Sequence, residues 1–363
     1  MGLRLYWVVG ELSGEQHAVR VIQALHRYRP DWAMRGLGGN LMQQVGVSLL
    51  AHWQDYAVVG FVEVVRKLPH FIRLMQKIKK DILAWRPDRV ILVDYPGFNL
   101  RLAQWLGRQG IPITYFIPPQ LWAWAPGRVR RLRQPDTQIL CILPFEPKFY
   151  ASYGLKALYV GHPLVTALKD TTPYSHPRPY IALLPGSRAH EVRHMLPVMA
   201  QLPSYFPEFD FLVSRVSHLP RELYERLAPG LTLVEVSAPA FLMGATAAVI
   251  TSGTATLEAA LVGTPAVIGY KGNPLSYHIA RRLVRVHFIG LPNLILNEAV
   301  FPELIQKEFT PEKVATALRT VLSQRTAIQA KLAELPRLLG EQDAATQAAE
   351  AILQAFSAKG KTG

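Results

Sequence analysis

Cysteine and long apolar runs are the features that this sequence most clearly lacks. Its 363 residues include one cysteine, Cys141, so no disulfide can form within the chain and a zinc site built on several cysteines is excluded. Glu11 interrupts the apolar start of the chain, and no run of about 18 apolar residues follows it. We therefore expect neither a signal peptide nor a membrane-spanning helix, and a protein that stays in the cytoplasm.

Acidic residues are also scarce relative to basic ones. The chain has 26 aspartates and glutamates against 40 lysines and arginines, which gives a formal net charge of +14. Such a charge favours nucleic acid, anionic lipid or phosphorylated substrates as partners, although it could also serve only to keep the protein soluble. No RNP, zinc-finger or KH signature is present, so nucleic acid is not expected as a partner.

What the sequence does contain is an alternation of short β-rich runs with longer helical patterns, over residues 5–143 and again over 180–270. This alternation is typical of parallel βαβ units and predicts an α/β protein of two Rossmann-like, doubly wound domains facing a central cleft. Residues 166–178 lose the apolar period, which favours a domain boundary there. We predict an N-terminal domain at 1–166, a C-terminal domain at 167–340, and a helical tail at 341–363 that packs on the N-terminal domain or on a partner chain.

The motif GELSGE, residues 10–15, follows the first predicted strand and opens a helix. Ligands of doubly wound sheets bind at the carboxyl ends of the strands, so this motif is expected to line the cleft. Gly14 allows close approach of a ligand, whereas Glu11 and Glu15 would repel a phosphate, so an acceptor sugar suits the motif better. The structural alternative is that Ser13 caps the helix and Glu15 interacts with the helix dipole.

Asp94 ends the apolar strand RVILVD and is expected to project at the edge of the cleft. Partial burial raises the pKa of a carboxyl toward neutrality, which suits a general base. The alternative is that Asp94 caps a helix that begins near Asn99.

Two further strand–turn–helix junctions lie in the second half of the chain. In the motif LPGSR, Arg188 can bind a diphosphate as a fork, and the N–H groups of Gly186 and Ser187 can assist it. In the motif SGTATLE, hydroxyl and N–H groups at a helix N-terminus suit phosphate oxygens, and Glu258 could accept hydrogen bonds from ribose hydroxyls. Ordinary helix capping explains either motif alone, but together they predict a nucleotide diphosphate site.

Residues 58–82 combine an apolar stripe with interleaved basic residues, and Pro69 predicts that a helix restarts there. Such a helix suits an anionic membrane surface or an acyl chain, although an ordinary core helix shows the same stripe. The aromatic run 115–124, which includes Trp122, could stack nucleobases or line a sugar and acyl pocket. The apolar stripe within residues 58–82 comprises Phe61, Val65, Leu68, Ile72, Met75 and Ile82.

These segments and others follow one another along the chain as GELSG, AVVGFVEV, VDYPGFNLRLA, WAWAPGRV, LPFEPKFY, VGHPL, LLPGSR, SGTATLEAAL and ARRLVRVHFIGLPNLI. In this order they resemble the lipid-A-disaccharide synthase family over about residues 10–306. The resemblance implies a GT-B fold, with the acceptor in the N-terminal domain and a UDP-sugar in the C-terminal domain. It also implies the condensation of UDP-2,3-diacylglucosamine with 2,3-diacylglucosamine 1-phosphate (lipid X) to a β-1,6-linked disaccharide 1-phosphate and UDP, with inversion and without a metal or cofactor.

By position, the resemblance assigns a role to each matching residue. Asp94 becomes the base for the acceptor 6-hydroxyl, Glu15 is the second choice, and Arg188 binds the diphosphate. The implied UDP-sugar residues are Gly186, Ser187, Arg188, Ser252, Gly253, Thr254, Glu258 and Asn293, and the implied acceptor residues are Glu11, Ser13, Gly14, Asn99 and Trp122.

The chain also departs from the family pattern. Glu15 and Gly97 stand where many members have aspartate, and PPQLWAW replaces SPxxWAW. The resemblance and the charge imply a peripheral position on anionic membrane, at the inner face of the cytoplasmic membrane, and a homodimer remains open. The alternatives are another UDP-sugar enzyme of this fold (a lipid-linked N-acetylglucosamine transferase or an epimerase), a nucleic-acid-binding protein, and an inactive membrane-surface binder.

Overall fold

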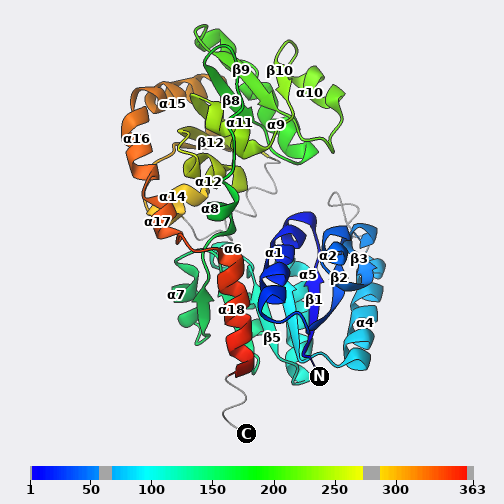
Figure 1. The fold of residues 1–363 in the computed structure, drawn as a ribbon. Helices are drawn as coiled ribbons and strands as arrows, with labels where there is room; N and C mark the ends of the chain where they lie inside the picture. The colour runs from blue at the N-terminus through cyan, green and yellow to red at the C-terminus, as the bar shows by residue number, and fades with distance from the viewer. Residues whose placement is uncertain (1, 57–67, 273–286, 358–363) are drawn as a thin grey trace. The chain divides into compact units, whose positions relative to one another are not determined.

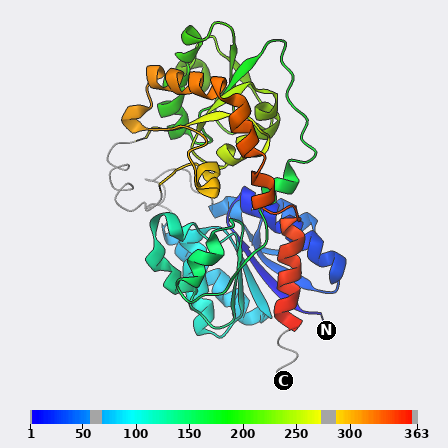
Figure 2. The same cartoon turned by 90° about the vertical axis from the view of Figure 1, so that its left-hand side faces the viewer.

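The computed structural model describes residues 2–56, 68–272 and 287–357, which form two compact units (Figures 1 and 2). The first unit extends to Pro163 and also contains the chain from Gln342 onward, and the second unit is Leu164–Glu341. The predicted domain limits at residues 166 and 340 stay predictions.

The first unit is built on a parallel sheet of seven described strands in the order β3-β2-β1-β4-β5-β6-β7. Strand β4 is buried at every position, as expected for an apolar run inside a doubly covered sheet. The strand order reverses at β1, which lies between β2 and β4, so ligands are expected where β1 and β4 end. The strands are β1 Arg4–Val9, β2 Ala33–Gly38, β3 Ser48–His52, β4 Arg89–Val93, β5 Ile113–Phe116, β6 Thr137–Cys141 and β7 Ala157–Tyr159. The helices are α1 Leu12–Tyr28, α2 Asn40–Gln44, α4 Leu68–Trp85, α5 Pro96–Arg108, α6 Leu121–Trp124, α7 Glu146–Ala151 and α18 Ala344–Ser357, with 3₁₀ turns η1 Trp53–Tyr56 and η2 Pro126–Leu132.

The second unit repeats this plan with six described parallel strands in the order β10-β9-β8-β11-β12-β13. Its order reverses at β8, between β9 and β11, so its switch point lies where β8 and β11 end. The strands are β8 Tyr180–Leu184, β9 Asp210–Ser214, β10 Thr232–Val234, β11 Ala247–Thr251, β12 Ala266–Tyr270 and β13 Glu303–Ile305. The helices are α8 Pro163–Ala167, α9 Ala189–Met199, α10 Arg221–Leu227, α11 Ala238–Gly244, α12 Thr254–Leu261, α14 Leu291–Leu296, α15 Pro311–Ser323, α16 Arg325–Leu332 and α17 Leu335–Leu338, with 3₁₀ turns η3 Leu202–Tyr205 and η4 Gln306–Glu308.

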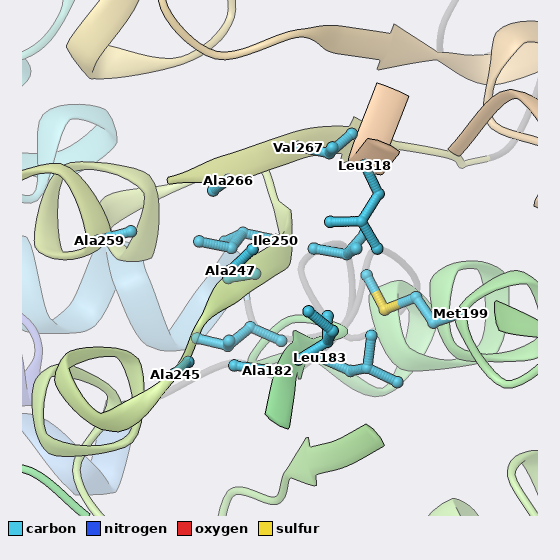
Figure 3. Packing of buried hydrophobic residues seen from close by; sticks show 14 of the residues in the cluster. Ala182, Leu183, Met199, Ala245, Ala247, Ile250, Ala259, Ala266, Val267 and Leu318 are labelled. Carbon is cyan, nitrogen blue, oxygen red and sulfur yellow. The ribbon is translucent and has the colours of Figure 1, made fainter. Parts of the chain in front are cut away.

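Each unit has its own hydrophobic core. In the first unit the adjacent β4 residues Ile91 and Leu92 belong to two different clusters, because successive side chains of a strand point to opposite faces of the sheet. In the second unit Leu183 of β8 packs in one cluster with Met199 of α9 and Leu318 of α15 (Figure 3). Helices therefore cover both faces of the first sheet, and the strand ends are left for ligands.

The C-terminal helix α18 packs beside α1 within the first unit, as the red and blue helices show (Figures 1 and 2). Ala348 and other small residues of α18 are buried, so the two helices can approach closely. Phe356 packs edge-on against Trp32 with ring centroids 5.1 Å apart, and Gln138 Nε2 donates a hydrogen bond of 2.8 Å to the Ala351 carbonyl. The C-terminal helix thus completes the core of the first unit.

The predicted stripe over residues 58–82 falls partly outside the described residues. Phe61 and Val65 lie there, and α4 is described from Leu68 onward. Pro69 stands in the first turn of α4, where a proline is tolerated and where the sequence predicts a restart.

The described part of α4 has one broad apolar face that is buried to different extents. Leu74, Ile78 and Ile82 are buried in the core of the first unit and Met75 packs against that core, whereas Ile72 is 51% exposed. The predicted stripe is therefore partly a core contact, as the structural alternative has it, and partly exposed. No helix in the described part of the chain is long and apolar enough to cross a membrane.

Candidate active site

Asp94 follows β4 in a turn that neighbouring side chains hold by binding its main-chain carbonyl. Asp94 and Tyr95 have left-handed φ values of 45° and 50°, a strained conformation that is uncommon outside glycine. The Asp94 carbonyl accepts hydrogen bonds from the Tyr115 hydroxyl at 2.7 Å and from Asn99 Nδ2 at 2.9 Å. The Asp94 carboxyl also accepts a hydrogen bond from the Tyr95 main-chain N–H, so both the carbonyl and the carboxyl of Asp94 are bonded in the turn.

The Asp94 carboxyl lies beside that of Glu11, which follows β1. Burial raises the pKa of Asp94 to about 7, and repulsion by the Glu11 carboxylate together with a hydrogen bond to it adds to this shift. Ser13 Oγ donates a hydrogen bond of 2.7 Å to Glu11 Oε1. The Asp94 carboxyl can therefore still take up a proton near neutral pH.

Neither of the two predicted helix caps is observed, although Glu15 lies in the first turn of α1, where an acid interacts favourably with the helix dipole. Helix α1 begins at Leu12 with Glu11 at the N-cap position and no side-chain capping bond, so Ser13 is not the cap. Helix α5 begins at Pro96, earlier than the predicted start near Asn99, because proline is favoured at the first position of a helix. Its N-cap is the left-handed Tyr95, so Asp94 does not cap it.

Glu15, the second choice for the base, is 1% exposed, and both of its oxygens are engaged. Oε1 accepts a hydrogen bond of 3.0 Å from the Met42 main-chain N–H, and Oε2 accepts one of 2.7 Å from Trp53 Nε1. A Cβ on Gly39 would lie 2.2 Å from Oε2, so only glycine leaves room for this carboxylate. Glu15 therefore links α1 to the start of α2 and to η1.

Replacing Glu15 by glutamine is expected to destabilise the first unit by about 1–3 kcal/mol, because the amide NH₂ would face a donor that the carboxylate now accepts from. Chemical denaturation followed by tryptophan fluorescence would measure this loss. Glu222→Gln, at an exposed glutamate of α10, is the control. Equal stability of the Glu15 variant and the wild type would contradict the assignment.

The two glycines of the GELSGE motif have packing reasons for being small. A Cβ on Gly10 would lie 2.3 Å from the Tyr95 ring, so glycine is required there. Gly14 is buried, and a Cβ on it would lie 3.2 Å from Val9 Cγ1, which brings α1 close to the sheet. Contact of Gly14 with an acceptor stays a prediction.

Asn99 and Trp122, both predicted acceptor residues, are held by protein groups. Asn99 is fully buried, and its Nδ2 donates to the carbonyls of Val93 and Asp94 at 3.2 and 2.9 Å. Trp122 is half-buried, and its Nε1 donates a hydrogen bond of 3.1 Å to Glu146 Oε1. Asn99 thus stabilises the Asp94 turn. A direct contact of Asn99 or Trp122 with an acceptor stays a prediction.

An apolar groove of about 560 Å³ adjoins the Asp94 turn between α4 and α5. Tyr95 stacks on Phe98 with ring centroids 5.4 Å apart, and Phe71 lies 6.4 Å from Tyr95. The groove is lined by Phe71, Ile72, Met75, Gln76, Lys79, Tyr95, Gly97, Phe98 and Arg101. We call this set the α4–α5 groove.

In the second unit a pocket of about 420 Å³ lies at the ends of β8 and β11, the switch point of that sheet. The LPGSR and SGTATLE motifs are brought together here, although they are far apart in the sequence. The described lining includes the predicted residues Gly186, Ser187, Arg188, Ser252, Gly253, Thr254 and Glu258. Asn293 is the one predicted UDP-sugar residue outside this lining.

Arg188 lies at the N-terminus of α9, with its guanidinium reaching into solvent. Its side chain is 72% exposed, and Nη1 pairs with Glu191 Oε1 at 2.9 Å. Glu191 Oε2 accepts the main-chain N–H groups of Ser187 and Arg188 at 3.0 and 3.1 Å. The Ser187 N–H, predicted to assist a diphosphate, is thus already bonded, whereas the other Arg188 nitrogens remain available for an anion.

The opposite wall of the pocket is the start of α12. Burial raises the pKa of Glu258 to about 7. Ser252 Oγ donates to the Ile289 carbonyl at 2.9 Å, so this hydroxyl can meet a ligand as an acceptor. Thr251 also lines the pocket, and its buried Oγ1 has no hydrogen-bond partner among the described residues.

Asn293 is fully buried, and it joins the start of α14 to β13. Its Nδ2 donates to Phe301 O at 2.8 Å and to Glu303 Oε1 at 2.9 Å. Glu303 also accepts the main-chain N–H groups of Ile289 and Gly290 at 2.8 and 2.9 Å. This network holds the segment that Ser252 also bonds.

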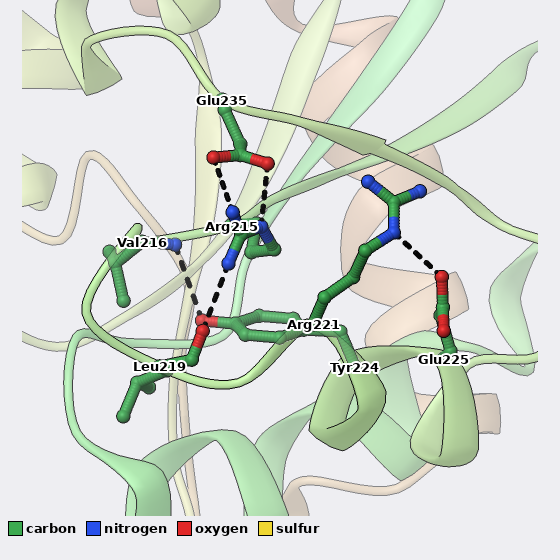
Figure 4. Close-up of polar contacts among 7 residues, drawn as sticks. All are labelled: Arg215, Val216, Leu219, Arg221, Tyr224, Glu225 and Glu235. Atoms are coloured by element: carbon green, nitrogen blue, oxygen red, sulfur yellow. Dashed lines mark hydrogen bonds and ion pairs between the residues drawn. The ribbon is translucent and has the colours of Figure 1, made fainter.

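One rim of the pocket is fixed by the loop after β9 (Figure 4). Arg215 pairs with Glu235 and donates a hydrogen bond of 2.9 Å to the Leu219 carbonyl. The Val216 N–H donates to the Tyr224 hydroxyl at 3.4 Å. Val216 itself lines the pocket, so these bonds give that wall a defined shape.

The sequence analysis did not single out several residues that support the two sites, although some of them carry a recognisable pattern. Glu191 stands three residues into the helix after Arg188, a spacing that signals a capping box. Buried Glu146, whose pKa burial raises to about 7, lies in the LPFEPKFY motif. His17 and His162 lie near each other and are largely buried, and burial lowers their pKa values to about 4 and about 3. Within the described ranges, no group of three or more His, Cys, Asp or Glu side chains is arranged to hold a metal ion.

Two Rossmann-like units, each with its polar residues at the switch point of a parallel sheet, define the GT-B class, and solved structures confirm this fold. The glycosyltransferase of kitacinnamycin superposes with a TM-score of 0.67 at 14% identity, covering 98% of this chain and 99% of that chain. A UDP-GlcNAc 2-epimerase from Neisseria meningitidis superposes with a TM-score of 0.61 at 10% identity, covering 97% and 99% of the two chains. Because transferases and epimerases share the fold, the fold alone does not separate them.

Sequence similarity separates them. Residues 5–356 match the family model described as lipid-A-disaccharide synthetase. The lipid-A-disaccharide synthase of Myxococcus xanthus (strain DK1622) is 38% identical over 371 residues, which cover 97% of each chain. The chain therefore belongs to the lipid-A-disaccharide synthase family of glycosyltransferases, as its motifs predict.

Proposed function

We propose that this chain transfers 2,3-diacylglucosamine from UDP to the 6-hydroxyl of 2,3-diacylglucosamine 1-phosphate (lipid X), forming the β-1,6-linked disaccharide 1-phosphate and UDP. Membership of the family supports this reaction. The observation that carries the assignment of the site is the Asp94–Glu11 pair, a carboxyl with a pKa near 7 at the switch point of a sheet. A general base is most effective when its pKa lies near the working pH.

In the proposed mechanism Asp94 takes the proton of the acceptor 6-hydroxyl as that oxygen attacks the sugar carbon bearing UDP. The new C–O bond forms, the bond to the UDP oxygen breaks, and the single displacement inverts the configuration at that carbon. Arg188 and the N-terminus of α12 balance the charge that develops on the diphosphate, without a metal. Glu15 acts as a positioning residue, because both of its oxygens are bonded.

We also propose that the acyl chains of the acceptor occupy the α4–α5 groove and that the protein sits on anionic membrane at the inner face of the cytoplasmic membrane. Exposed Ile72 lies on α4 among basic residues, and the whole chain carries a net charge of +14. Co-sedimentation with phosphatidylglycerol vesicles tests the membrane proposal, and sedimentation velocity tests the homodimer.

The function is tested by incubating the protein with both substrates in neutral detergent and EDTA, and following UDP and disaccharide by mass spectrometry. We expect both products in equal amounts. If the protein binds UDP but forms no disaccharide, the assignment of the nucleotide pocket would stand and the assignment of the acceptor would be contradicted. Loss of product on adding EDTA would contradict the metal-independent mechanism.

The proposed base predicts a pH profile. Asp94 must be deprotonated to act, and its pKa is raised to about 7, so log kcat/KM should rise with pH and level off above that value. Glu11→Gln removes the neighbouring charge, so it should lower the Asp94 pKa and move the acid limb to lower pH. An acid limb that stays in place in this variant would contradict the role of the pair.

A further inference from the structure

Two cations stand at the rim of the α4–α5 groove, and the proposed mechanism does not use them. Lys79 comes from α4 and Arg101 from α5, and both line the groove. Arg101 is exposed, and neither side chain makes an ion pair within residues 2–56, 68–272 and 287–357. Lys79 Nζ lies 5.2 Å from the centre of the Trp105 ring, which orients it beside α5.

The helix register places Arg101 on the groove side of α5 at some distance from Asp94. Gly97, Phe98 and Arg101 all line the groove, as residues three and four apart on one helix face do. At a rise of about 1.5 Å per residue, Arg101 stands ~7 Å along the helix from Pro96, which follows the Asp94 turn. The groove therefore begins at Tyr95, the residue after Asp94, and continues over an apolar floor to positive charge farther along α5.

This inference rests on the proposed function. We propose that Arg101, assisted by Lys79, binds the 1-phosphate of the acceptor and selects a phosphorylated sugar over an unphosphorylated one. An acceptor of this class has its reacting hydroxyl at one end of the sugar ring, its phosphate at the other, and acyl chains beside the ring. The groove presents an apolar floor and two cations, and Tyr95 connects it to the Asp94 turn, so the three parts follow the same order as in such an acceptor. A guanidinium binds phosphate as a two-pronged donor.

The test measures kinetics in uncharged detergent with wild type, Arg101→Ala and Arg101→Lys. We expect Arg101→Ala to raise the KM for the acceptor phosphate about 10- to 100-fold, the range for losing hydrogen bonds to a charged group, and to leave the KM for the UDP-sugar within about twofold. Arg101→Lys should restore part of the loss because it keeps the charge without the fork. Arg108→Ala, an exposed arginine two turns farther along α5 and outside the groove lining, should behave as wild type.

A second readout uses the dephosphorylated sugar, 2,3-diacylglucosamine, as a competitive inhibitor. Its inhibition constant should be the same for wild type and Arg101→Ala, since it lacks the group that Arg101 binds. Equal weakening of both sugars would show that Arg101 supports the groove in general and would overturn the proposal. An unchanged acceptor KM in Arg101→Ala, or an equal loss in Arg108→Ala, would overturn it as well.

The membrane is the rival source of phosphate, and a third arm separates it. We expect that repeating the assay with phosphatidylglycerol in the micelles leaves unchanged the ratio of the acceptor KM of Arg101→Ala to that of the wild type. An effect of Arg101→Ala that occurs only with this lipid would assign the cation to the bilayer and contradict the proposal. If wild type forms no disaccharide at all, the proposed function fails and this inference fails with it; if wild type is active and only the Arg101 results disagree, this inference alone fails.

Discussion

Replacing Asp94 by asparagine is expected to lower kcat by about 10²–10⁴-fold, the usual contribution of a general base. The fold should survive, because Tyr115 and Asn99 bind the carbonyl of residue 94, and the asparagine side-chain oxygen can still accept the Tyr95 main-chain N–H. Asparagine also removes the repulsion from Glu11, so the melting temperature should not fall. Initial rates at saturating substrates, with UDP binding and Tm as controls, would measure this.

A variant that keeps more than about a tenth of the wild-type rate would contradict the assignment of Asp94 as base. Asp170→Asn, an exposed carboxyl of the second unit, is the matched control and should keep full activity.

Replacing Arg188 by alanine is expected to lower kcat/KM for the UDP-sugar by about 10²–10³-fold, as losing a donor to developing negative charge does. The start of α9 should stay intact, because Glu191 still accepts the main-chain N–H groups of residues 187 and 188. Titration calorimetry with UDP should show weaker binding than wild type.

Arg193→Ala is the control for Arg188, since Arg193 is exposed on the same helix and does not line the pocket. Normal UDP affinity in the Arg188 variant would assign the diphosphate to other groups. A large fall in Tm would indicate a structural role instead.

Much of this fold can be predicted from sequence patterns. In a βαβ protein the buried strands are short apolar runs, and ligands bind where those runs end. The two nucleotide motifs were predicted to share a pocket, and the structure brings their residues together at β8 and β11. Asp94 was predicted at a strand end with a raised pKa, and its pKa is about 7. The roles of these residues in catalysis stay predictions.

What the sequence could not provide is the direction of individual polar side chains. Glu15 stands in the right motif, but its partners Met42 and Trp53 lie far along the chain, and they turn it inward. Asn99 and Asn293 also lie near strand ends, yet both donate to buried main-chain carbonyls. A sequence pattern locates such a residue at the edge of a sheet. It does not show whether the side chain binds a ligand or holds the neighbouring main chain.

The apolar face of α4 illustrates a different limit. Leu74 and Ile78 are buried in the core, whereas Phe71 and Met75 pack against that core and also line the groove. Spacing alone predicts an apolar face but not which part of it remains open. That depends on what packs against each part of the face.

The return of α18 to the first unit makes the second unit an insertion in the chain of the first. During synthesis the ribosome must therefore produce the whole second unit before the helix that covers α1 leaves the exit tunnel. Domains usually fold in the order in which they emerge. Here the first unit emerges first, but its last helix is synthesised after the whole second unit. The nascent first unit must wait with an apolar side of α1 and Trp32 uncovered, which makes it the stage at which a chaperone would be most useful.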